Sequence, residues 1–412
     1  MKGNVLVGQS GGPTAVINSS LAGVFKAAKD CGYSKVYGMQ NGIQGFLQEK
    51  VVDMSEYIKN GLDLELLRRT PAAFLGSCRF KLPEIEEDKA LYERIFQLLD
   101  KLNIEVCIYI GGNDSMDTIR KLYDYSVMVG SNRKFVGCPK TIDNDLAITD
   151  HTPGYGSAAK YIATSVKEAM CDATSFVNKN KSVNVFEIMG RNAGWLAGAA
   201  ALCKGDDCDG PDLIYLPEIP FSIEGFMAEV KKLLEKKDVV VAVVSEGIKT
   251  AEGKYVCEYA SSNIATDAFG HKQMSGTAAY LSALVASETG SKTRAIELST
   301  LQRAASHLAS KVDIDEAFEA GRATVKAADE GTSGVMVTIN RVSNDPYRSA
   351  TSVYDVHQIA NDERVVPREW INEEGNYVTQ EFLDYARPLI QGEYLPVMVD
   401  GIPRHLSLRT KG

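Results

Sequence analysis

The sequence has no apolar run long enough to cross a membrane, and its first residues, MKGNVLVGQSGG, lead into a predicted strand without the apolar core of a signal peptide. It also has no excess of positive charge, since 54 aspartate and glutamate residues outnumber 45 lysine and arginine residues. The resulting formal net charge of −9 disfavours an extended surface for nucleic acid. These absences predict a cytoplasmic protein that binds neither membranes nor nucleic acid.

Paired cysteines and flexible linkers are missing as well. The eight cysteines are scattered, and the closest two, Cys203 and Cys208, have no second pair at zinc-binding spacing. Reduced thiols of a cytoplasmic protein are therefore expected. No low-complexity segment or internal repeat interrupts the 412 residues, and 44% apolar with 24% charged residues is ordinary for a globular protein. This length predicts two or three closely joined domains.

The middle of the sequence contains a β-loop-α-β unit. Residues 106–110 and 134–138 are apolar runs of strand length, and residues 115–125 between them are predicted to be helical. The first strand ends in the loop GGNDS, residues 111–115, and the second in PKTIDND, residues 139–145. Parallel sheets present functional loops at the carboxyl ends of their strands, so both loops are expected to face one crevice.

These two loops carry the parts that phosphoryl transfer needs. The paired glycines let backbone amides approach a ligand, and Ser115 could cap the following helix, whose amino end suits a phosphate. Lys140 supplies a cation, while Asp143 and Asp145 suggest a general base and a metal-linked group. Either loop alone could be an ordinary turn, because glycine, asparagine and aspartate favour turns anywhere. Their succession on consecutive strands favours phosphate chemistry.

The rest of the chain alternates predicted strands and helices. A second glycine-rich cradle, GQSGGP at residues 8–13, is not a Walker A motif, because no GK[ST] follows it. Residues 42–46 are predicted to form a loop, and beyond residue 341 the pattern weakens into a turn-rich tail with one helix at 379–390. Continuous apolar runs such as 239–244 are typical of strands covered by helices on both faces. The pattern therefore predicts an α/β fold with mostly parallel sheets.

Seven short motifs between residues 8 and 303 occur in an order that resembles the phosphofructokinase family: GQSGG, GSCRF, GGNDS, PKTIDND, MGR, SEG and LQR. The tail, with VPREW and YARPLIQGEYLP, is similar to the longer bacterial pyrophosphate-dependent branch of that family. The resemblance implies two Rossmann-like three-layer α/β/α lobes with mostly parallel sheets and an active site in the cleft between them.

The resemblance also implies how the chain is divided. Residues 1–150 would form the larger lobe, on the phosphate-donor side, and residues 151–245 the smaller lobe, on the sugar-phosphate side. Parts of 246–340 would belong to each lobe, and 341–412 would form an extension packed on both.

Individual residues receive roles from the same resemblance. Asp143 would accept the proton of the sugar 1-hydroxyl, and the guanidinium of Arg191 would stabilise the transferring phosphoryl group. The catalytic set is Asp143, Arg191, Lys140 and Asp114. The set for fructose 6-phosphate is Thr141, Ile142, Asp143, Met189, Gly190, Arg191, Glu246, Arg294, Thr300 and Arg303. The set for pyrophosphate is Gly11, Gly12, Arg79, Gly112 and Ser115, and the magnesium ligands are Asn113 and Asp145.

Some of these residues have plainer explanations, and others depart from the family pattern. Met189 could belong to the core, Glu246 could cap a helix, and Arg294 could be a surface cation rather than one that reaches a neighbouring subunit. Thr300 stands where relatives often have a histidine, which weakens the expected grip on the sugar 6-phosphate. Asn113 stands where ATP-using relatives tend to have an aspartate, and a neutral amide oxygen is a weaker magnesium ligand.

The phosphate donor is predicted from Asp114 and Lys140, whose positions are typically glycines in ATP-using relatives. A carboxylate roughly 4 Å from the α-phosphate of ATP would cost about 4 kcal/mol per charge pair at an effective dielectric near 20. Pyrophosphate has no α-phosphate, so Asp114 would exclude only ATP, while Lys140 would supply positive charge to the transferring group. The sequence therefore favours pyrophosphate.

The resulting hypothesis is a reversible, magnesium-dependent transfer from pyrophosphate to the 1-hydroxyl of fructose 6-phosphate, in a homodimer or homotetramer. One alternative is an ATP-dependent 6-phosphofructokinase. A second is a catalytically silent regulatory subunit that only binds sugar phosphate, which the presence of Asp143 and Arg191 disfavours.

Overall fold

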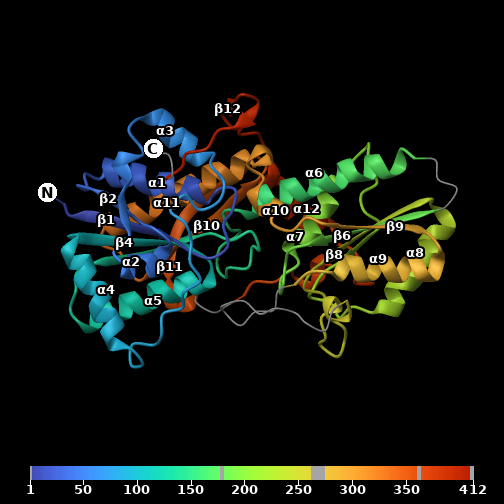
Figure 1. Ribbon diagram of the computed structural model, residues 1–412, viewed down its shortest axis with the longest axis horizontal. Helices are drawn as coiled ribbons and strands as arrows, with labels where there is room; N and C mark the ends of the chain where they lie inside the picture. Colours follow the sequence, from blue (N-terminus) through green and yellow to red (C-terminus); the bar gives the residue numbers. More distant parts are fainter. Residues whose placement is uncertain (1, 177–180, 261–273, 360–362, 409–412) are drawn as a thin grey trace. The chain divides into compact units, whose positions relative to one another are not determined.

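The computed structural model describes residues 2–176, 181–260, 274–359 and 363–408, and the chain divides into two compact units. Unit 1 comprises Met1–Ser157, Arg303–Glu363 and Gln391–Gly412. Unit 2 comprises Ala158–Gln302 and Arg364–Ile390. Each unit is therefore assembled from separate segments of the sequence, and the colours of Figure 1 mix accordingly within each unit.

Unit 1 is built on a seven-stranded sheet with the strand order β11-β10-β5-β4-β1-β2-β3. The five inner strands are parallel, while the edge strands β3 and β11 pair antiparallel with their neighbours. The strands are β1 (Asn4–Gln9), β2 (Val36–Met39), β3 (Val51–Asp53), β4 (Ile104–Gly111), β5 (Lys134–Pro139), β10 (Val335–Asn344) and β11 (Tyr347–Asp355).

Helices cover both faces of this sheet, which is why its inner strands are apolar on both sides. One buried cluster joins the sheet to α1 (Ile17–Asp30), α3 (Gly61–Arg68) and α11 (Lys311–Asp329). A second cluster joins it to α2 (Gly42–Leu47), α4 (Lys89–Lys101) and α5 (Asn113–Met128). Figure 1 shows α1 and α11 on one side of the strands and α4 and α5 on the other.

Two glycines let α1 and α11 pack closely. A Cβ added at Gly23 would lie 2.0 Å from the backbone oxygen of Phe318, and one at Gly321 would lie 2.0 Å from that of Ser20. Any larger residue at either position would force the helices apart. The position of α11 matters for the site, because this helix also contacts the loop that follows β5.

Unit 2 contains a four-stranded parallel sheet with the order β7-β8-β6-β9. Its strands are β6 (Ser182–Ile188), β7 (Leu213–Tyr215), β8 (Val239–Ser245) and β9 (Lys292–Glu297). Side chains of α8 (Ile223–Lys236) and α9 (Thr277–Thr289) fill the core on one face. On the other side α7 (Trp195–Ala199) contacts three of the strands, and Figure 1 shows α6 (Tyr155–Thr174) opposite α9.

A cluster of aromatic rings joins the C-terminal part of unit 2 to α7. The fully buried ring of Trp195 lies 6.0 Å from that of Phe382 and 5.2 Å from that of Tyr385 in α12 (Gln380–Ala386). Its indole nitrogen donates a hydrogen bond to the backbone oxygen of Arg364 at 3.1 Å. Residues 364–390 are therefore part of the core of unit 2.

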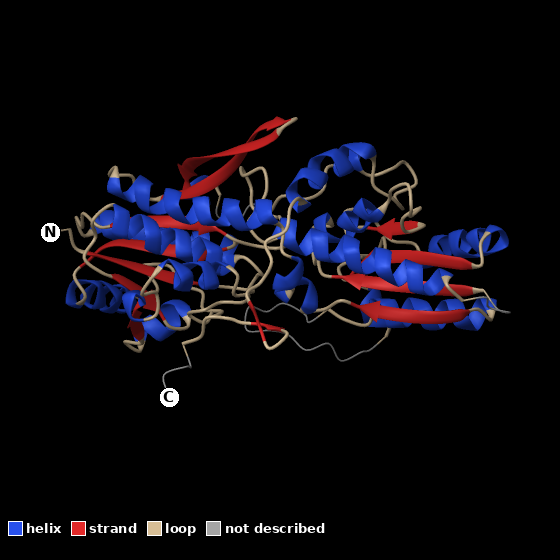
Figure 2. Cartoon of the chain, turned by 90° about the horizontal axis from the view of Figure 1, so that it is seen from above, coloured by secondary structure: helices blue, strands red, loops and turns tan. Residues whose placement is uncertain are grey.

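The predicted α/β class with mostly parallel, helix-covered sheets is confirmed, but three local predictions were wrong. Residues 42–46 belong to helix α2 rather than to a loop, because Ile43 and Phe46 are buried in the core. The tail beyond residue 341 contributes β11, which forms the long antiparallel strand pair with β10 seen in Figure 2. Ser115 does not cap α5, since Gly112 occupies the N-cap position and Ser115 lies inside the first turn.

The remaining α-helix and β-strands among the described residues are short: α10 (Leu301–Ala304), β12 (Met398–Val399) and β13 (Ile402–Pro403). Within the ranges that the structure describes, no helix combines the length and hydropathy that a bilayer-spanning segment requires.

Candidate functional site

The loops after β1, β4 and β5 meet at the carboxyl end of the sheet in unit 1. The backbone nitrogen of Lys140 donates to the oxygen of Gly111 at 3.0 Å, and that of Ser10 donates to Ile110 at 3.0 Å. The ammonium of Lys140 donates to the backbone oxygen of Gly12 at 2.7 Å. A Cβ added at Gly11 would lie 3.3 Å from this ammonium nitrogen, so glycine leaves room for it. The glycine cradles and the lysine therefore form one cluster.

Lys140 is 3% exposed, and its burial lowers the pKa of its ammonium group to about 8. Asp143 and Asp145 act against this shift, whereas the positive charges of Arg303 and Arg79 add to it. Four of the predicted residues thus influence Lys140 electrostatically. A buried ammonium among mixed charges can neutralise an anion without the screening that water provides.

The loop 141–145 is held in a defined turn. The backbone nitrogen of Asp143 donates to the hydroxyl of Thr141 at 3.1 Å. Asn144 adopts a left-handed conformation with φ of 56°, and its buried side-chain oxygen accepts from the backbone nitrogen of Thr152 at 3.0 Å. Burial, reinforced by the neighbouring Asp143, raises the pKa of the Asp145 carboxyl to about 7. Thr141 and Ile142 are themselves buried.

The amino end of α5 follows β4 at the same end of the sheet. Asn113 and Asp114 are its first two residues, and the backbone of Gly112 forms its N-cap. The side-chain oxygen of Asn113 is buried and has no hydrogen-bond partner. Asp114 is exposed, so its charge is better screened than the effective dielectric near 20 of the sequence argument assumes. Ser115 is buried, and its hydroxyl approaches the backbone of Gly111 too closely for a Cβ there.

Two arginines lie on the same side of unit 1. The hydroxyl of Ser77 donates to the backbone oxygen of Gly11 at 2.6 Å, which ties the segment containing exposed Arg79 to the first glycine cradle. Arg303, expected with the sugar-phosphate residues, lies beside Gly12, where an added Cβ would be 3.0 Å from its Nη1. Unit 1 therefore collects all of the predicted donor and metal residues and, in addition, Arg303.

Unit 2 brings the MGR and SEG motifs together at the carboxyl ends of β6 and β8. The backbone nitrogen of Gly190 donates to the carboxylate of Glu246 at 3.4 Å, and the hydroxyl of Ser245 donates to the backbone oxygen of Gly190. Gly190 has φ of 141°, a conformation that favours glycine. Met189 and Arg191 flank it, both partly exposed.

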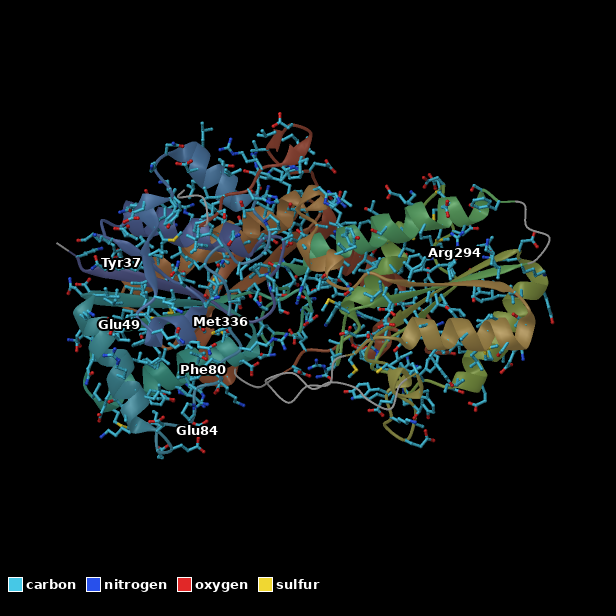
Figure 3. The ribbon with its side chains drawn as sticks, in the orientation of Figure 1. Tyr37, Glu49, Phe80, Glu84, Arg294 and Met336 are labelled. Carbon is cyan, nitrogen blue, oxygen red and sulfur yellow. The ribbon has the colours of Figure 1, made fainter. Side chains whose placement is uncertain are left out.

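Arg294 stands apart from this pair of loops, whereas Thr300 follows β9 at the same edge of the sheet as the MGR loop. Arg294 lies on β9 (Figure 3), where it pairs in register with Asn184, four residues before the end of β6. Four strand residues span about 13 Å. The guanidinium of Arg294 forms an exposed ion pair with Asp172 at 3.2 Å, and Thr300 is exposed in the turn after β9. The structure therefore does not bring Arg294 next to the MGR loop within unit 2.

Some residues that organise the site carried no role in the sequence prediction. Gln302 is 1% exposed, and its side-chain oxygen accepts from the backbone nitrogen of Met189 at 3.4 Å. Its place between Leu301 and Arg303 in the LQR motif was the available signal. Ser77 and Ser245 fix backbone oxygens of glycines, and only the motifs around them could have indicated this.

All of the side-chain atoms that this site offers to a divalent cation are oxygens. Within the part of the chain that the structure describes, no three histidine, cysteine, aspartate or glutamate side chains gather as they would around a fully protein-bound metal. The candidate ligands are the unpartnered amide oxygen of Asn113 and the two carboxylates of the 141–145 loop. Magnesium commonly uses one or two carboxylates together with water and substrate phosphates, so this oxygen set fits it.

Comparisons with known proteins agree with the motif pattern. Residues 4–327 match the family model described as phosphofructokinase. A curated relative from Xanthomonas campestris pv. campestris, named pyrophosphate–fructose 6-phosphate 1-phosphotransferase, is 42% identical over 408 residues, or 99% of this chain and 96% of the relative. A protein of the same name from Halomonas elongata is 41% identical over 98% of this chain and 96% of its own.

A solved structure gives the same result for the fold. The pyrophosphate-dependent phosphofructokinase from Nitrosospira multiformis is 37% identical, with a TM-score of 0.89 over 99% of this chain and 97% of that one. The similarity thus extends past residue 327 into the C-terminal segment.

Proposed function

Because this chain belongs to the phosphofructokinase family, we propose that it transfers a phosphoryl group reversibly from pyrophosphate to the 1-hydroxyl of fructose 6-phosphate. The products are fructose 1,6-bisphosphate and phosphate. The main support is the 41–42% identity, over nearly the whole chain, to two enzymes named for this reaction. The cluster of Lys140 with the glycine cradles provides the chemistry that such a reaction needs.

Asp143 is the proposed general base. The hydroxyl of Thr141 accepts a hydrogen bond from its backbone nitrogen, which restrains the backbone from which the carboxylate extends. A carboxylate placed beside the 1-hydroxyl can accept its proton as the oxygen attacks phosphorus. Ile142 beside it is buried.

Lys140 and Arg191 are proposed to neutralise the transferring phosphoryl group. The Lys140 ammonium already binds one backbone oxygen and is largely shielded from water, which strengthens its interaction with a phosphate oxygen. The planar guanidinium of Arg191 suits the charge spread over the equatorial oxygens. Asp114 is proposed to disfavour the larger, more anionic nucleotide donor.

The pyrophosphate is proposed to bind to the backbone amides of Gly11, Gly12 and Gly112, with Ser115 and Arg79 beside them. Glycines at these positions leave the backbone accessible, and the amino end of α5 favours an anion. Met189, Gly190, Glu246 and Arg303 are proposed to bind fructose 6-phosphate.

We propose magnesium as the cofactor, held by Asn113 and Asp145. When bound, it would supply positive charge that offsets the negative charge of the phosphate donor. Asp145 must be ionised to serve as a ligand. The pKa of its carboxyl is raised to about 7, so part of it is protonated at neutral pH, and a bound cation would shift it to the ionised form. The buried oxygen of Asn113 would gain the partner that the protein itself does not supply.

The proposal extends to the assembly and location of the protein. Arg294 lies away from the MGR loop in its own unit, which supports a role toward a neighbouring copy in a homodimer or homotetramer. Light scattering with the wild type and Arg294→Ala, together with sugar-phosphate affinity, tests that role. We propose a cytoplasmic location, in keeping with the unpaired cysteines.

The deciding experiment is a panel of donors and acceptors assayed in both directions with magnesium. We expect turnover with pyrophosphate and fructose 6-phosphate, and the reverse reaction with fructose 1,6-bisphosphate and phosphate. Strong use of ATP without use of pyrophosphate would favour the ATP-dependent alternative. Absence of turnover with every donor, combined with sugar-phosphate binding, would favour a silent regulatory subunit.

A further inference from the structure

A buried charge cluster fixes the chain immediately after the catalytic loop. His151 is 1% exposed, and its two ring nitrogens lie 2.8 Å from a carboxylate oxygen of Asp150 and 2.6 Å from one of Glu316. An ionised carboxylate only accepts hydrogen bonds, so both nitrogens must donate, which requires the protonated imidazolium. His151 is thus a buried cation between two anions that come from different parts of unit 1.

Each anion is itself anchored. Glu316 of α11 also accepts from the hydroxyl of Tyr347 at 2.7 Å and from that of Ser349 at 2.6 Å, both on β11. The guanidinium of Arg341 on β10 donates to Asp150 at 3.1 Å. Two positive groups therefore face two carboxylates, and neutral His151 would leave an excess of buried negative charge.

The surrounding groups favour the charged histidine. Burial by itself lowers the pKa of His151, but Glu316 and Asp150 outweigh it and raise the pKa to about 9. The same contacts hold the pKa values of both carboxyl groups below their ordinary range. Asp313 and Tyr347 are the other titratable groups near Glu316, and burial raises the pKa of each.

Hydrogen bonds connect this cluster to the catalytic loop. The hydroxyl of Thr152, next to His151, donates to the backbone oxygen of Thr141 at 2.7 Å, and its backbone nitrogen donates to Asn144. The backbone nitrogen of Thr141 donates in turn to Pro153 at 3.2 Å. Asp313, one turn before Glu316 on α11, accepts from the backbone nitrogens of Gly154 and Ser157, both at 2.8 Å.

We infer that His151 is a positioning residue: its imidazolium fastens residues 150–154 to α11 and the β10–β11 hairpin, and this attachment holds Thr141 and Asp143 in their working geometry. The inference rests on the proposed function only for its effect on turnover. Its structural part concerns the loop alone and can be tested without any substrate.

The chain offers a matched control within the same unit. His357 also lies between two carboxylates, 2.6 Å from Asp355 and 2.9 Å from Asp124, but its side chain is 42% exposed. Asp124 is ten residues along α5 from Asp114, about 15 Å on the helix axis. The control has the same local chemistry, but both carboxylate partners of its side chain lie outside residues 141–154.

The test compares His151→Gln, Glu316→Gln and His357→Gln by steady-state kinetics and amide hydrogen exchange. For the first two we expect kcat with pyrophosphate to fall about tenfold to a hundredfold, as small misplacements of catalytic groups do, with smaller changes in KM. Exchange should accelerate at the amides of Thr141, Asp143 and Gly154. His357→Gln should match the wild type in both measurements.

Three results would overturn the inference. The first is normal kcat and normal loop exchange in folded His151→Gln and Glu316→Gln. The second is faster exchange spread evenly over unit 1, and the third is an equal loss in His357→Gln. If His151→Gln does not fold, Glu316→Gln decides alone. If the wild type does not turn over pyrophosphate, the proposed function fails, but exchange at residues 141–154 still decides the role of His151.

Discussion

The ammonium of Lys140 donates a hydrogen bond to the backbone oxygen of Gly12 at 2.7 Å and thereby joins the loop after β5 to the loop after β1. A lysine that cross-links two glycine-containing loops has a defined position before any anion arrives. Since Lys140 is 3% exposed, its charge state also depends on its surroundings. This contact leads to the first two predictions.

The activity with pyrophosphate should have a narrow pH optimum. Lys140 is cationic below its pKa of about 8, so kcat/KM should fall as the pH rises through that value. Asp145 is ionised above its pKa of about 7, so kcat/KM should also fall as the pH drops below that value. Added magnesium should move the acidic limb to lower pH, because the cation stabilises the ionised carboxylate. A flat profile between about pH 6 and about pH 9 would contradict these assignments.

Replacing Asp114 and Lys140 by glycine should change the activities with ATP and with pyrophosphate in opposite directions. Lys140→Gly should lower kcat with pyrophosphate by about a hundredfold, since it removes a preorganised cation. Asp114→Gly should raise kcat/KM with ATP. Because Asp114 is exposed, the gain is expected between about fivefold and about a thousandfold, which corresponds to about 1–4 kcal/mol.

A matched variant distinguishes charge from size at position 114. Asp114→Asn removes the charge and keeps the volume, so equal gains in Asp114→Asn and Asp114→Gly would indicate electrostatic exclusion. A gain only in Asp114→Gly would indicate a steric effect. Unchanged ATP kinetics in both variants would refute the role proposed for Asp114.

Asn113 should control the magnesium requirement. Asn113→Asp places a carboxylate where the unpartnered amide oxygen now lies, so the magnesium concentration for half-maximal activity should fall. Asn113→Leu removes the oxygen and should raise it. Isothermal titration with magnesium and pyrophosphate provides an independent reading, and Asn132→Asp, in the exposed turn before β5, serves as the control. Equal magnesium dependence in all variants would remove Asn113 from the site.

Glu187 should make the stability of unit 2 depend on pH. Its carboxylate accepts from the backbone nitrogen of Ala278 at 2.8 Å, and burial raises the pKa of its side chain from 4.5 to about 7. The folded state therefore binds a proton that the unfolded chain releases in this range, so stability should fall as the pH rises from 4.5 to about 7. The slope should approach about 1.4 kcal/mol per pH unit.

Unfolding by urea at several pH values measures this slope. Glu187→Gln should flatten it, whereas Glu235→Gln, at an exposed position of α8, should leave it unchanged. If Glu187→Gln keeps the full slope, the pH dependence of stability comes from titratable groups other than Glu187.

The loops of the site could be predicted from sequence because each motif is local. GGNDS and PKTIDND directly follow apolar strands, and strand ends in a parallel sheet lie at one edge. Glycines 11 and 12 are likewise identified by the strand before them. Their common cluster in unit 1 follows from topology alone.

Features that depend on contacts between residues far apart in the sequence could not be predicted from local motifs. Helix α2 contains two glycines, which disfavour helices, and tertiary contacts, among them the burial of Ile43 and Phe46, hold it in place. The exposed residues of β11 have no apolar alternation, since this strand is defined by its pairing with β10. The role of Gln302 depends on a contact with Met189, which is 113 positions earlier.

The alternation of the chain between units 1 and 2 determines what a truncated protein would lose. The chain passes from one unit to the other four times, so no single cut yields either unit complete. A truncation at residue 327, where the family match ends, would remove β10 and β11 from unit 1 and would also expose Trp195 of unit 2 by deleting Tyr385 and Phe382. Late frameshifts should therefore destabilise both units at once.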